Sequence, residues 1–312
     1  MPTSTWTKPN KTYILFGTTF TMPPPPSSTP TNPPHPRVLL FDIGGVVVVS
    51  PFQAIINYER SHKIPQGWIN HSIAASAPHG AWQRLERGEI FLDEQFYEDF
   101  RRDLTDEKRW RVYYAKSVAA QKGEDQGQAA EEAAYQAPPP PSIDAEELYW
   151  SMMHIARKPD PYMYPALQRL REAADENPGT LVLAAMSNTS IFPEGHAFND
   201  PATADGRFHA EMRGLFDVFV SSAHVGMRKP HEDIYYYTLG RVGEFAKQKG
   251  WDGDAIRVGD VTFLDDIGSN LKTGRKVGFG TIRVTLGRVQ EAVEELEGIT
   301  GLVLLDGSKA KL

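Results

Sequence analysis

The stretch "RVLLFDIGGVVVVS", residues 37–50, decides the fold. Its apolar run Val38–Phe41 has the length of a buried strand, and it ends on a single carboxylate, Asp42. Gly44 and Gly45 follow directly, as expected where a backbone turns tightly beside a bound group and leaves no room for side chains. We therefore expect a ligand-binding loop at the carboxyl end of this strand.

Composition restricts the partners and the compartment. The chain has 312 residues, a formal net charge of -7 and no Lys/Arg-rich run, so nucleic acid is not an expected partner. No apolar run approaches the roughly 20 residues of a membrane-spanning helix, so we expect no membrane partner. The absence of cysteine excludes disulfides and thiolate chemistry and favours a cytoplasmic protein. An acid-free, Ser/Thr-rich N-terminal segment leaves organelle targeting as a weaker alternative.

Two segments are expected to lie outside the folded core. Residues 1–36 end in "TMPPPPSSTPTNPPHP", whose dense proline opposes both helix and sheet pairing and predicts a disordered leader. Residues 121–142, "QKGEDQGQAAEEAAYQAPPPPS", are polar, repetitive and end in proline. They predict an insertion loop whose loss is tolerated.

The remaining chain alternates between strand and helix patterns. Five further apolar runs predict strands: Leu181–Met186, Val218–Ser221, Val261–Leu264, Thr281–Val284 and Leu302–Leu305. Helical patterns such as residues 165–176 and 232–249 separate most of them, which predicts an α/β fold with a doubly wound, mainly parallel sheet flanked by helices.

Residues 52–158 have a different character. Phe96, Phe100 and Leu104 recur at helical spacing after Asp93, a plausible N-cap, and residues 145–158 also show a helical pattern. One strand followed by about a hundred helical residues indicates a helical cap domain inserted after the first strand. The core is then expected to comprise residues 37–51 and 159–312.

Ligands of open parallel sheets bind beyond the carboxyl ends of the strands. The polar residues expected there are Asp42, Ser187 and Asn188 of "SNTS", Lys229, Asp265 and Asp266. Their order and context resemble the haloacid dehalogenase-like (HAD) hydrolase superfamily. Within it, "FDIGGV", "RLERGEI", "RKPHEDIY" and "FLDDIGSNLKTGRKVGFGTI" resemble the phosphatase-like N-terminal domain of soluble epoxide hydrolases, over roughly residues 37–290.

The resemblance implies a Mg²⁺-dependent phosphomonoester hydrolase that acts through an aspartyl-phosphate on a small phosphorylated metabolite. Asp42 would be the nucleophile, and Lys229 would supply catalytic positive charge. Ser187, Asn188 and Lys229 would bind the phosphate, while Asp42, Gly44, Asp265 and Asp266 would hold the Mg²⁺. A cation is needed because attack of a carboxylate on an anionic phosphate is electrostatically opposed.

Gly44 departs from the common family pattern, which places a second Asp there to protonate the leaving group. General acid–base catalysis is worth about 10² to 10⁴ in rate, so a catalytically impaired HAD-like binding or regulatory protein, a pseudophosphatase, is the alternative. A haloacid dehalogenase, with the same nucleophile and no metal, is a minor one.

Several residues keep simpler local interpretations. Ser187 and Asn188 could cap a helix, and Lys229 could be a solvated loop charge. Asn270 could orient an acid or cap the following helix. His62, His71 and His79 could reach the site from the cap or be ordinary packing residues. Oligomeric state is not indicated by the sequence.

Overall fold

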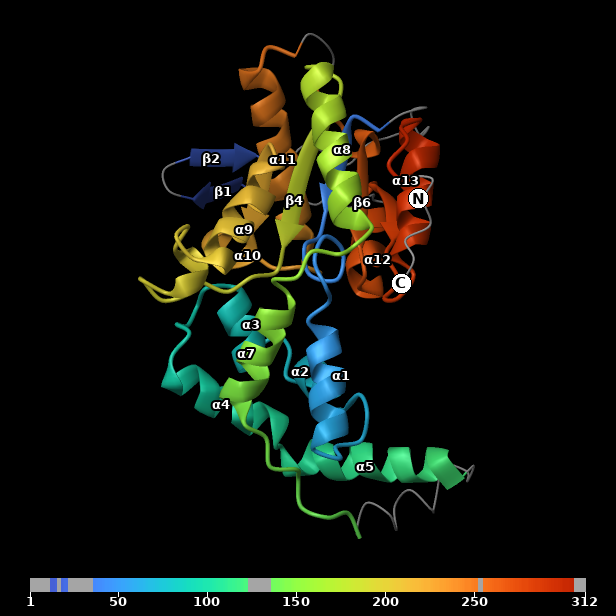
Figure 1. Cartoon of the computed structure of the whole chain (residues 1–312). Helices are drawn as coiled ribbons and strands as arrows, with labels where there is room; N and C mark the ends of the chain where they lie inside the picture. The colour runs from blue at the N-terminus through green and yellow to red at the C-terminus, as the bar shows by residue number, and fades with distance from the viewer. Residues whose placement is uncertain (1–11, 16–17, 22–35, 123–135, 252–254, 306–312) are drawn as a thin grey trace, which may run out of the picture.

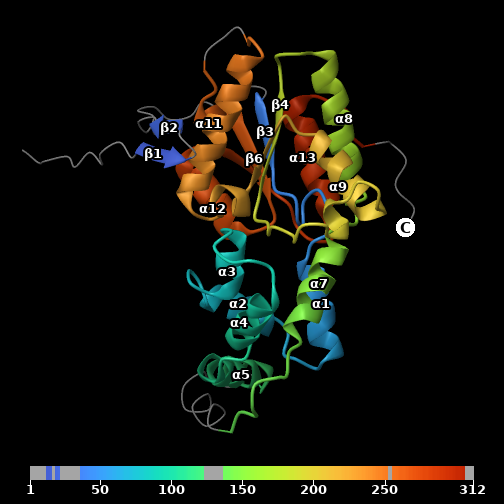
Figure 2. The same cartoon turned by 90° about the vertical axis from the view of Figure 1, so that its left-hand side faces the viewer.

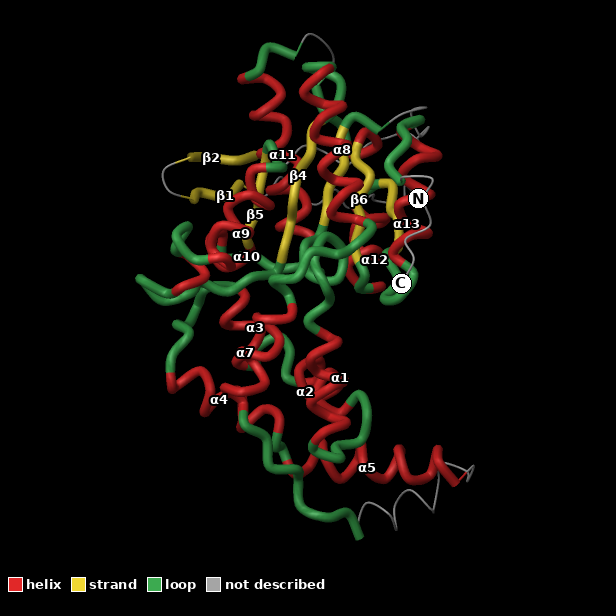
Figure 3. The backbone as a smooth tube through the Cα atoms, in the orientation of Figure 1, coloured by secondary structure: helices red, strands yellow, loops and turns green. Residues whose placement is uncertain are grey.

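A five-stranded parallel sheet forms the centre of the computed structural model, which describes residues 12–15, 18–21, 36–122, 136–251 and 255–305. The strand order is β5-β4-β3-β6-β7, and every neighbouring pair is parallel (Figure 1, Figure 3). The strands are β3 (Val38–Phe41), β4 (Val182–Ser187), β5 (Val218–Ser221), β6 (Val261–Asp265) and β7 (Gly280–Arg283). The chain adds strands first on one side of β3 and then on the other, so the topological switch point lies at the end of β3, where Asp42 follows.

Helices cover both faces of this sheet, as Figure 2 shows. Leu39 and Phe41 pack in one core cluster with α8 (Met163–Glu176) and α13 (Val289–Thr300). Val38 and Leu40 point to the other face and pack with α11 (Glu232–Gln248) and α12 (Gly268–Val277). A strand buried on both faces has continuous rather than alternating hydrophobicity, which explains the apolar run before Asp42. The predicted doubly wound α/β fold is confirmed.

A second group of helices, the helical lobe, lies beyond the carboxyl ends of the strands (Figure 1). It consists of α1 (Phe52–Ser61), α2 (Trp68–Ala75), α3 (Ala81–Glu86), α4 (Glu94–Leu104), α5 (Glu107–Lys122) and α7 (Ala145–Ile155), and it has a core cluster of its own. Asp93 caps α4 as expected, because its Oδ1 accepts a hydrogen bond of 3.0 Å from the Phe96 N–H. The predicted domain limits themselves stay predictions.

Smaller helices complete the loops that follow β4, β5 and α11. They are η1 (Ala197–Asn199), α9 (Ala204–Gly214), α10 (Ser222–Val225) and η2 (Val258–Asp260). None of the helices in the described residues combines the length and the apolar character needed to cross a membrane.

The segment Leu302–Leu305 is not a strand, so that prediction was wrong. The N–H groups of Leu304 and Leu305 donate to Oε1 of Glu297, at 2.6 and 2.9 Å, instead of pairing with a neighbouring strand. Leu304 is buried in the cluster beneath α13. The apolar pattern therefore marks chain packed against the core.

The two segments expected outside the core are described only in part. Residues 12–15 and 18–21 of the leader form an antiparallel pair, β1 (Thr12–Leu15) and β2 (Thr18–Thr21), in a stretch that contains no proline and is rich in Thr and aromatic residues. The predicted disorder of residues 1–36 stays a prediction. The proline-dense residues 22–35 lie outside the described residues, as do residues 123–135 of the predicted insertion. The end of that insertion contacts the helical lobe, since Trp110 Nε1 donates to the Pro138 carbonyl at 2.7 Å.

Candidate active site

Asp42 is held rigidly at the end of β3. Its N–H donates to the Leu264 carbonyl on β6 at 2.9 Å, and the residue is only 6% exposed. Oδ1 accepts hydrogen bonds from the Ile43 N–H at 2.7 Å and from Lys229 Nζ at 2.8 Å. Within the described residues Oδ2 accepts none, so one carboxylate oxygen is anchored and the other is left for chemistry.

Lys229 bridges two carboxylates. Its Nζ lies 2.8 Å from Asp42 Oδ1 and 2.7 Å from Asp265 Oδ2, and the residue is 1% exposed. Burial alone would lower the pKa of Lys229, but Asp265 and Asp42 outweigh this effect and raise it, so the ammonium stays charged. A solvated loop charge, the simpler interpretation of the sequence, does not describe this lysine.

Asn188 positions Lys229 rather than pointing freely at a ligand. Its Oδ1 accepts from the Lys229 N–H at 2.9 Å, and its Nδ2 donates to the Lys229 carbonyl at 3.1 Å. The phosphate-binding role predicted for Ser187 and Asn188 stays a prediction. Ser187, at the end of β4, is the freer of the two, because within the described residues its hydroxyl makes only a long contact of 3.5 Å, with the Asn188 carbonyl.

Asp265 has both oxygens occupied by protein donors. Besides Lys229, the Ile267 N–H donates to Oδ1 at 2.8 Å, and Asn270 Nδ2 reaches Oδ1 and Oδ2 at 3.0 and 3.1 Å. Asn270 thus orients an acid, one of the two roles that the sequence left open. Asp265 is built to hold Lys229, which makes it an indirect partner in any metal site.

Asp266 provides the opposite environment. Its Oδ1 is buried and has no hydrogen-bond partner among the described residues, an arrangement that costs free energy unless something else binds it. Oxygens of Asp42, Asp265 and Asp266 lie within 4.8 Å of one another. Three carboxylates facing one ammonium leave two negative charges uncompensated, and carboxylate oxygens are the ligands that Mg²⁺ prefers. The residues present therefore fit a divalent cation.

The acidity of these groups reflects the same crowding. Burial raises the pKa of Asp42 to about 6, although Lys229 opposes the shift. Burial, together with the charges of Asp42 and Asp265, raises the pKa of Asp266 to about 8. Without a cation, Asp266 is thus the group that takes up a proton near neutral pH.

The two glycines after Asp42 differ in what they require. Gly45 has φ +80°, and a Cβ there would lie 2.3 Å from Asp266 Oδ2, so no larger residue fits without displacing the carboxylate. Gly44 has no such conformation, and its Cβ would meet only the Pro51 ring, at 3.3 Å. Gly45 makes room for Asp266, whereas Gly44 leaves open the position at which the common family pattern places an acid.

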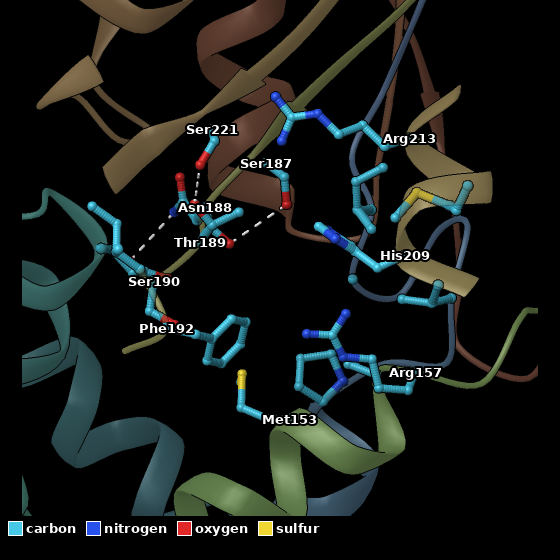
Figure 4. Close-up of a pocket in the computed structure, with 18 of the residues that line it drawn as sticks. Met153, Arg157, Ser187, Asn188, Thr189, Ser190, Phe192, His209, Arg213 and Ser221 are labelled. Atoms are coloured by element: carbon cyan, nitrogen blue, oxygen red, sulfur yellow. Dashed lines mark hydrogen bonds between the residues drawn. The ribbon is translucent and has the colours of Figure 1, made fainter. Parts of the chain in front are cut away.

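A cavity of about 300 Å³ opens from this site toward the helical lobe (Figure 4). Gly44, Ser187 and Asn188 contribute to its lining from the strand ends, and Trp82, Tyr149 and Met153 contribute from the lobe. The lining residues do not include Asp42, Lys229, Asp265 or Asp266. His62, His71 and His79 are not lining residues either.

Among the lining residues that sequence reasoning missed are Glu86, Arg157, His209 and Arg213. Glu86 ends α3, is 8% exposed, and accepts a 2.6 Å ion pair from Arg228 Nε. Its carbonyl also accepts from Ser222 Oγ at 2.6 Å. Burial raises the pKa of Glu86, and Arg228 opposes the shift. The "RLERGEI" and "RKPHEDIY" motifs therefore meet, and their contact docks the lobe onto the strand ends.

No protein-family model matches the chain. Acyl-CoA dehydrogenase family member 10 of Mus musculus is 27% identical over 270 residues, which cover 86% of this chain and 19% of that protein. Bifunctional epoxide hydrolase 2 of Sus scrofa is 25% identical over 275 residues, which cover 86% of this chain and 40% of that protein. The chain thus spans less than half the length of these relatives. A solved structure of a predicted HAD-like family hydrolase from Porphyromonas gingivalis aligns with 84% of this chain and 98% of its own, at 17% identity and a TM-score of 0.43.

The sequence comparison bears out the resemblance to epoxide hydrolases, because the Sus scrofa protein aligns with 86% of this chain at 25% identity. The HAD-like motifs are the ones that converge in the structure, since the strand-end residues Asp42, Lys229, Asp265 and Asp266 meet at the switch point of the sheet. These residues alone are compatible with hydrolysis at phosphorus or at carbon.

Proposed function

We propose that the chain is a Mg²⁺-dependent phosphomonoester hydrolase that acts through an aspartyl-phosphate on a small phosphorylated metabolite. The observation that carries the proposal is the orphaned Oδ1 of Asp266 beside Asp42 and Asp265. A dehalogenase needs no cation, and a third carboxylate with an unpartnered buried oxygen would then only destabilise the fold. Phosphate transfer requires a cation, and the Oδ1 of Asp266 would be one of its ligands.

The chain's own residues account for the transfer in two steps. Oδ2 of Asp42 attacks phosphorus, the bond to the leaving oxygen breaks, and the leaving oxygen takes a proton from water, which leaves hydroxide. Water then attacks phosphorus, the bond from phosphorus to Asp42 breaks, and its electron pair returns to the carboxylate. The phosphate product gives a proton to the hydroxide. Lys229 keeps Asp42 ionised and aimed throughout.

Mg²⁺ would be held by Asp42 and Asp266, together with the Gly44 carbonyl, and would neutralise charge that develops on the phosphate oxygens. Asp265 would act through Lys229, which it holds at 2.7 Å. The Ser187 hydroxyl would donate to one of the remaining phosphate oxygens.

Gly44 favours a second candidate, a binding or regulatory protein with this fold. Without a carboxyl group at this position, the leaving oxygen must depart with its charge or be protonated by water. A phosphatase of this kind should prefer substrates with acidic leaving groups, whereas a pure binding protein should bind phosphate and release none.

The test is phosphate release from a panel of phosphomonoesters, with Mg²⁺ and with a chelator, by the native chain, Asp42→Asn and Asp175→Asn. Asp175 is a surface carboxylate on α8, 66% exposed, and serves as the matched control. We expect release that requires Mg²⁺, disappears in Asp42→Asn and persists in Asp175→Asn. Absence of release from folded protein would favour the binding protein, and metal-independent halide release from a 2-haloacid would favour the dehalogenase.

A further inference from the structure

The cavity beside the proposed phosphate site carries an excess of positive charge. Arg157 follows α7, and Arg213 lies on α9. Neither forms an ion pair within the described part of the chain. Glu86 is the sole acidic residue among the described lining residues, and its carboxylate is already paired with Arg228 at 2.6 Å. Two guanidinium groups therefore face the cavity without a counterion of their own.

Aromatic rings hold both guanidinium groups by their faces. The Arg157 guanidinium lies 4.0 Å from the Phe198 ring centroid and 5.3 Å from that of Phe192. The Arg213 guanidinium lies 4.8 Å from the centroid of Phe219. Stacking fixes the plane of a guanidinium and leaves its N–H edge free, which is the geometry that recognises carboxylate or phosphate.

Helix α9 carries the other two groups of this region, His209 and Arg213. His209 and Arg213 lie one turn apart on the same face of this helix. Gly206 allows α9 to dock closely, because a Cβ there would lie 2.1 Å from the Asp200 carbonyl oxygen. In Figure 4, Arg157 and His209 point into the cavity from opposite elements, with Arg213 above them.

The electrostatics of this corner favour an anion. Burial, together with the charges of Arg157 and Arg213, lowers the pKa of His209 to about 4, so the imidazole is a neutral donor or acceptor at neutral pH. Burial lowers the pKa of Arg157, and Asp205 opposes this shift without forming an ion pair with it. Each guanidinium group lies at the cavity without an ion-pair partner among the described residues, and a bound anion would supply that partner.

We propose that Arg157, Arg213 and His209 bind a second anionic group, a carboxylate or a phosphate, of the small molecule whose first phosphate is cleaved at Asp42. This inference rests on the proposed function and narrows its substrate to a phosphorylated acid or a bisphosphate. The cavity volume of about 300 Å³ is at the lower end for ligand sites, so the substrate is small. Met153 and Phe192 also line the cavity and give it an apolar wall that suits a short carbon chain.

Binding of non-hydrolysable probes tests the inference independently of turnover. The probes are 3-phosphonopropionate, ethane-1,2-bisphosphonate and propylphosphonate, which lacks the second anion, titrated calorimetrically into the native chain with Mg²⁺. We expect 3-phosphonopropionate, ethane-1,2-bisphosphonate or both, which carry a second anionic group, to bind about tenfold or more tightly than propylphosphonate, as a charge-assisted bidentate contact allows. The tighter of the two identifies the second group as carboxylate or phosphate.

Variants locate the contact. Arg157→Met and Arg213→Met each keep an unbranched apolar side chain over the aromatic ring and should bring the preference for the second anion to within about twofold. Arg207→Met, an exposed position on α9 outside the lining, is the matched control and should keep it.

Equal affinity for the probes with and without the second anion, absence of binding by all three, or a preference that persists in both arginine variants would overturn the inference. Preferential binding without phosphate release from any ester would leave it standing and would count against the proposed hydrolase alone.

Discussion

Replacing Gly45 by alanine adds one methyl group next to Asp266 and so tests whether a cation binds there. Gly45 has φ +80°, and the new Cβ would lie 2.3 Å from Asp266 Oδ2 and 2.8 Å from its Cγ. A non-glycine residue in this conformation costs about 1–2 kcal/mol. The carboxylate can turn away from the methyl group, so the close contact should appear mainly as lost Mg²⁺ binding, with affinity lower by about tenfold or more.

The magnitude can be measured as Mg²⁺-dependent stabilisation. A ligand at a hundred times its Kd stabilises the native state by about 2.7 kcal/mol, and a tenfold weaker Kd reduces this to about 1.4 kcal/mol. Chemical unfolding of the native chain and of Gly45→Ala, each with Mg²⁺ and with chelator, gives the stabilisation by Mg²⁺ in each protein. The difference between the two proteins in chelator gives the loss of intrinsic stability. Gly44→Ala is the matched control, because its Cβ would only press on the Pro51 ring at 3.3 Å and should cost less than Gly45→Ala on both counts. Undiminished Mg²⁺ stabilisation in Gly45→Ala would refute the placement of the cation beside Asp266.

Three further outcomes follow from the same structure. Gly44→Asp should raise turnover of alkyl phosphates by about tenfold or more and of aryl phosphates less, because it restores a general acid; equal effects on both, in steady-state rates, would speak against that role. With chelator present, the free energy of unfolding should fall by up to about 1.4 kcal/mol per pH unit between pH 6 and 8. The reason is that Asp266, with a pKa of about 8, holds a proton in the folded state that the unfolded chain has lost. The unfolding free energy of Asp266→Asn should lack this slope. Glu86→Gln should destabilise the chain by about 2 kcal/mol, since it leaves Arg228 without its 2.6 Å partner, whereas Glu89→Gln, at a carboxylate 47% exposed, should cost less than about 0.5 kcal/mol in denaturant unfolding.

The strand ends could be predicted from the sequence because their information is local. The run Val38–Phe41 is buried on both faces, so its hydrophobicity is continuous, and the polar residue that ends it is conspicuous. In a parallel sheet such ends meet at one edge, which is how Asp42, Lys229 and Asp265 come within 2.8 Å contacts. The false strand Leu302–Leu305 shows the limit, since burial against a core produces the same apolar pattern without pairing.

The cavity could not be predicted from the sequence because its walls come from distant segments. Arg157 and Arg213 are separated by more than fifty residues, and no periodicity connects a loop after α7 to the face of α9. The Glu86–Arg228 pair likewise depends on how the helical lobe docks. Asn188 was assigned to phosphate from its place after a predicted strand and from the family resemblance, and this role stays a prediction. The structure adds that its amide is engaged with the backbone of Lys229.

The central claim is that Asp42 carries the phosphoryl group. The most direct measurement is the intact mass of the native chain after acid quenching during turnover of an aryl phosphate with Mg²⁺, followed by fragmentation to locate any modification. We expect a fraction of the native chain to be heavier by one phosphoryl group, which is located on Asp42 and is labile to hydroxylamine. This species should be absent from Asp42→Asn. Steady phosphate release with no such species, or with the group on another residue, would contradict it.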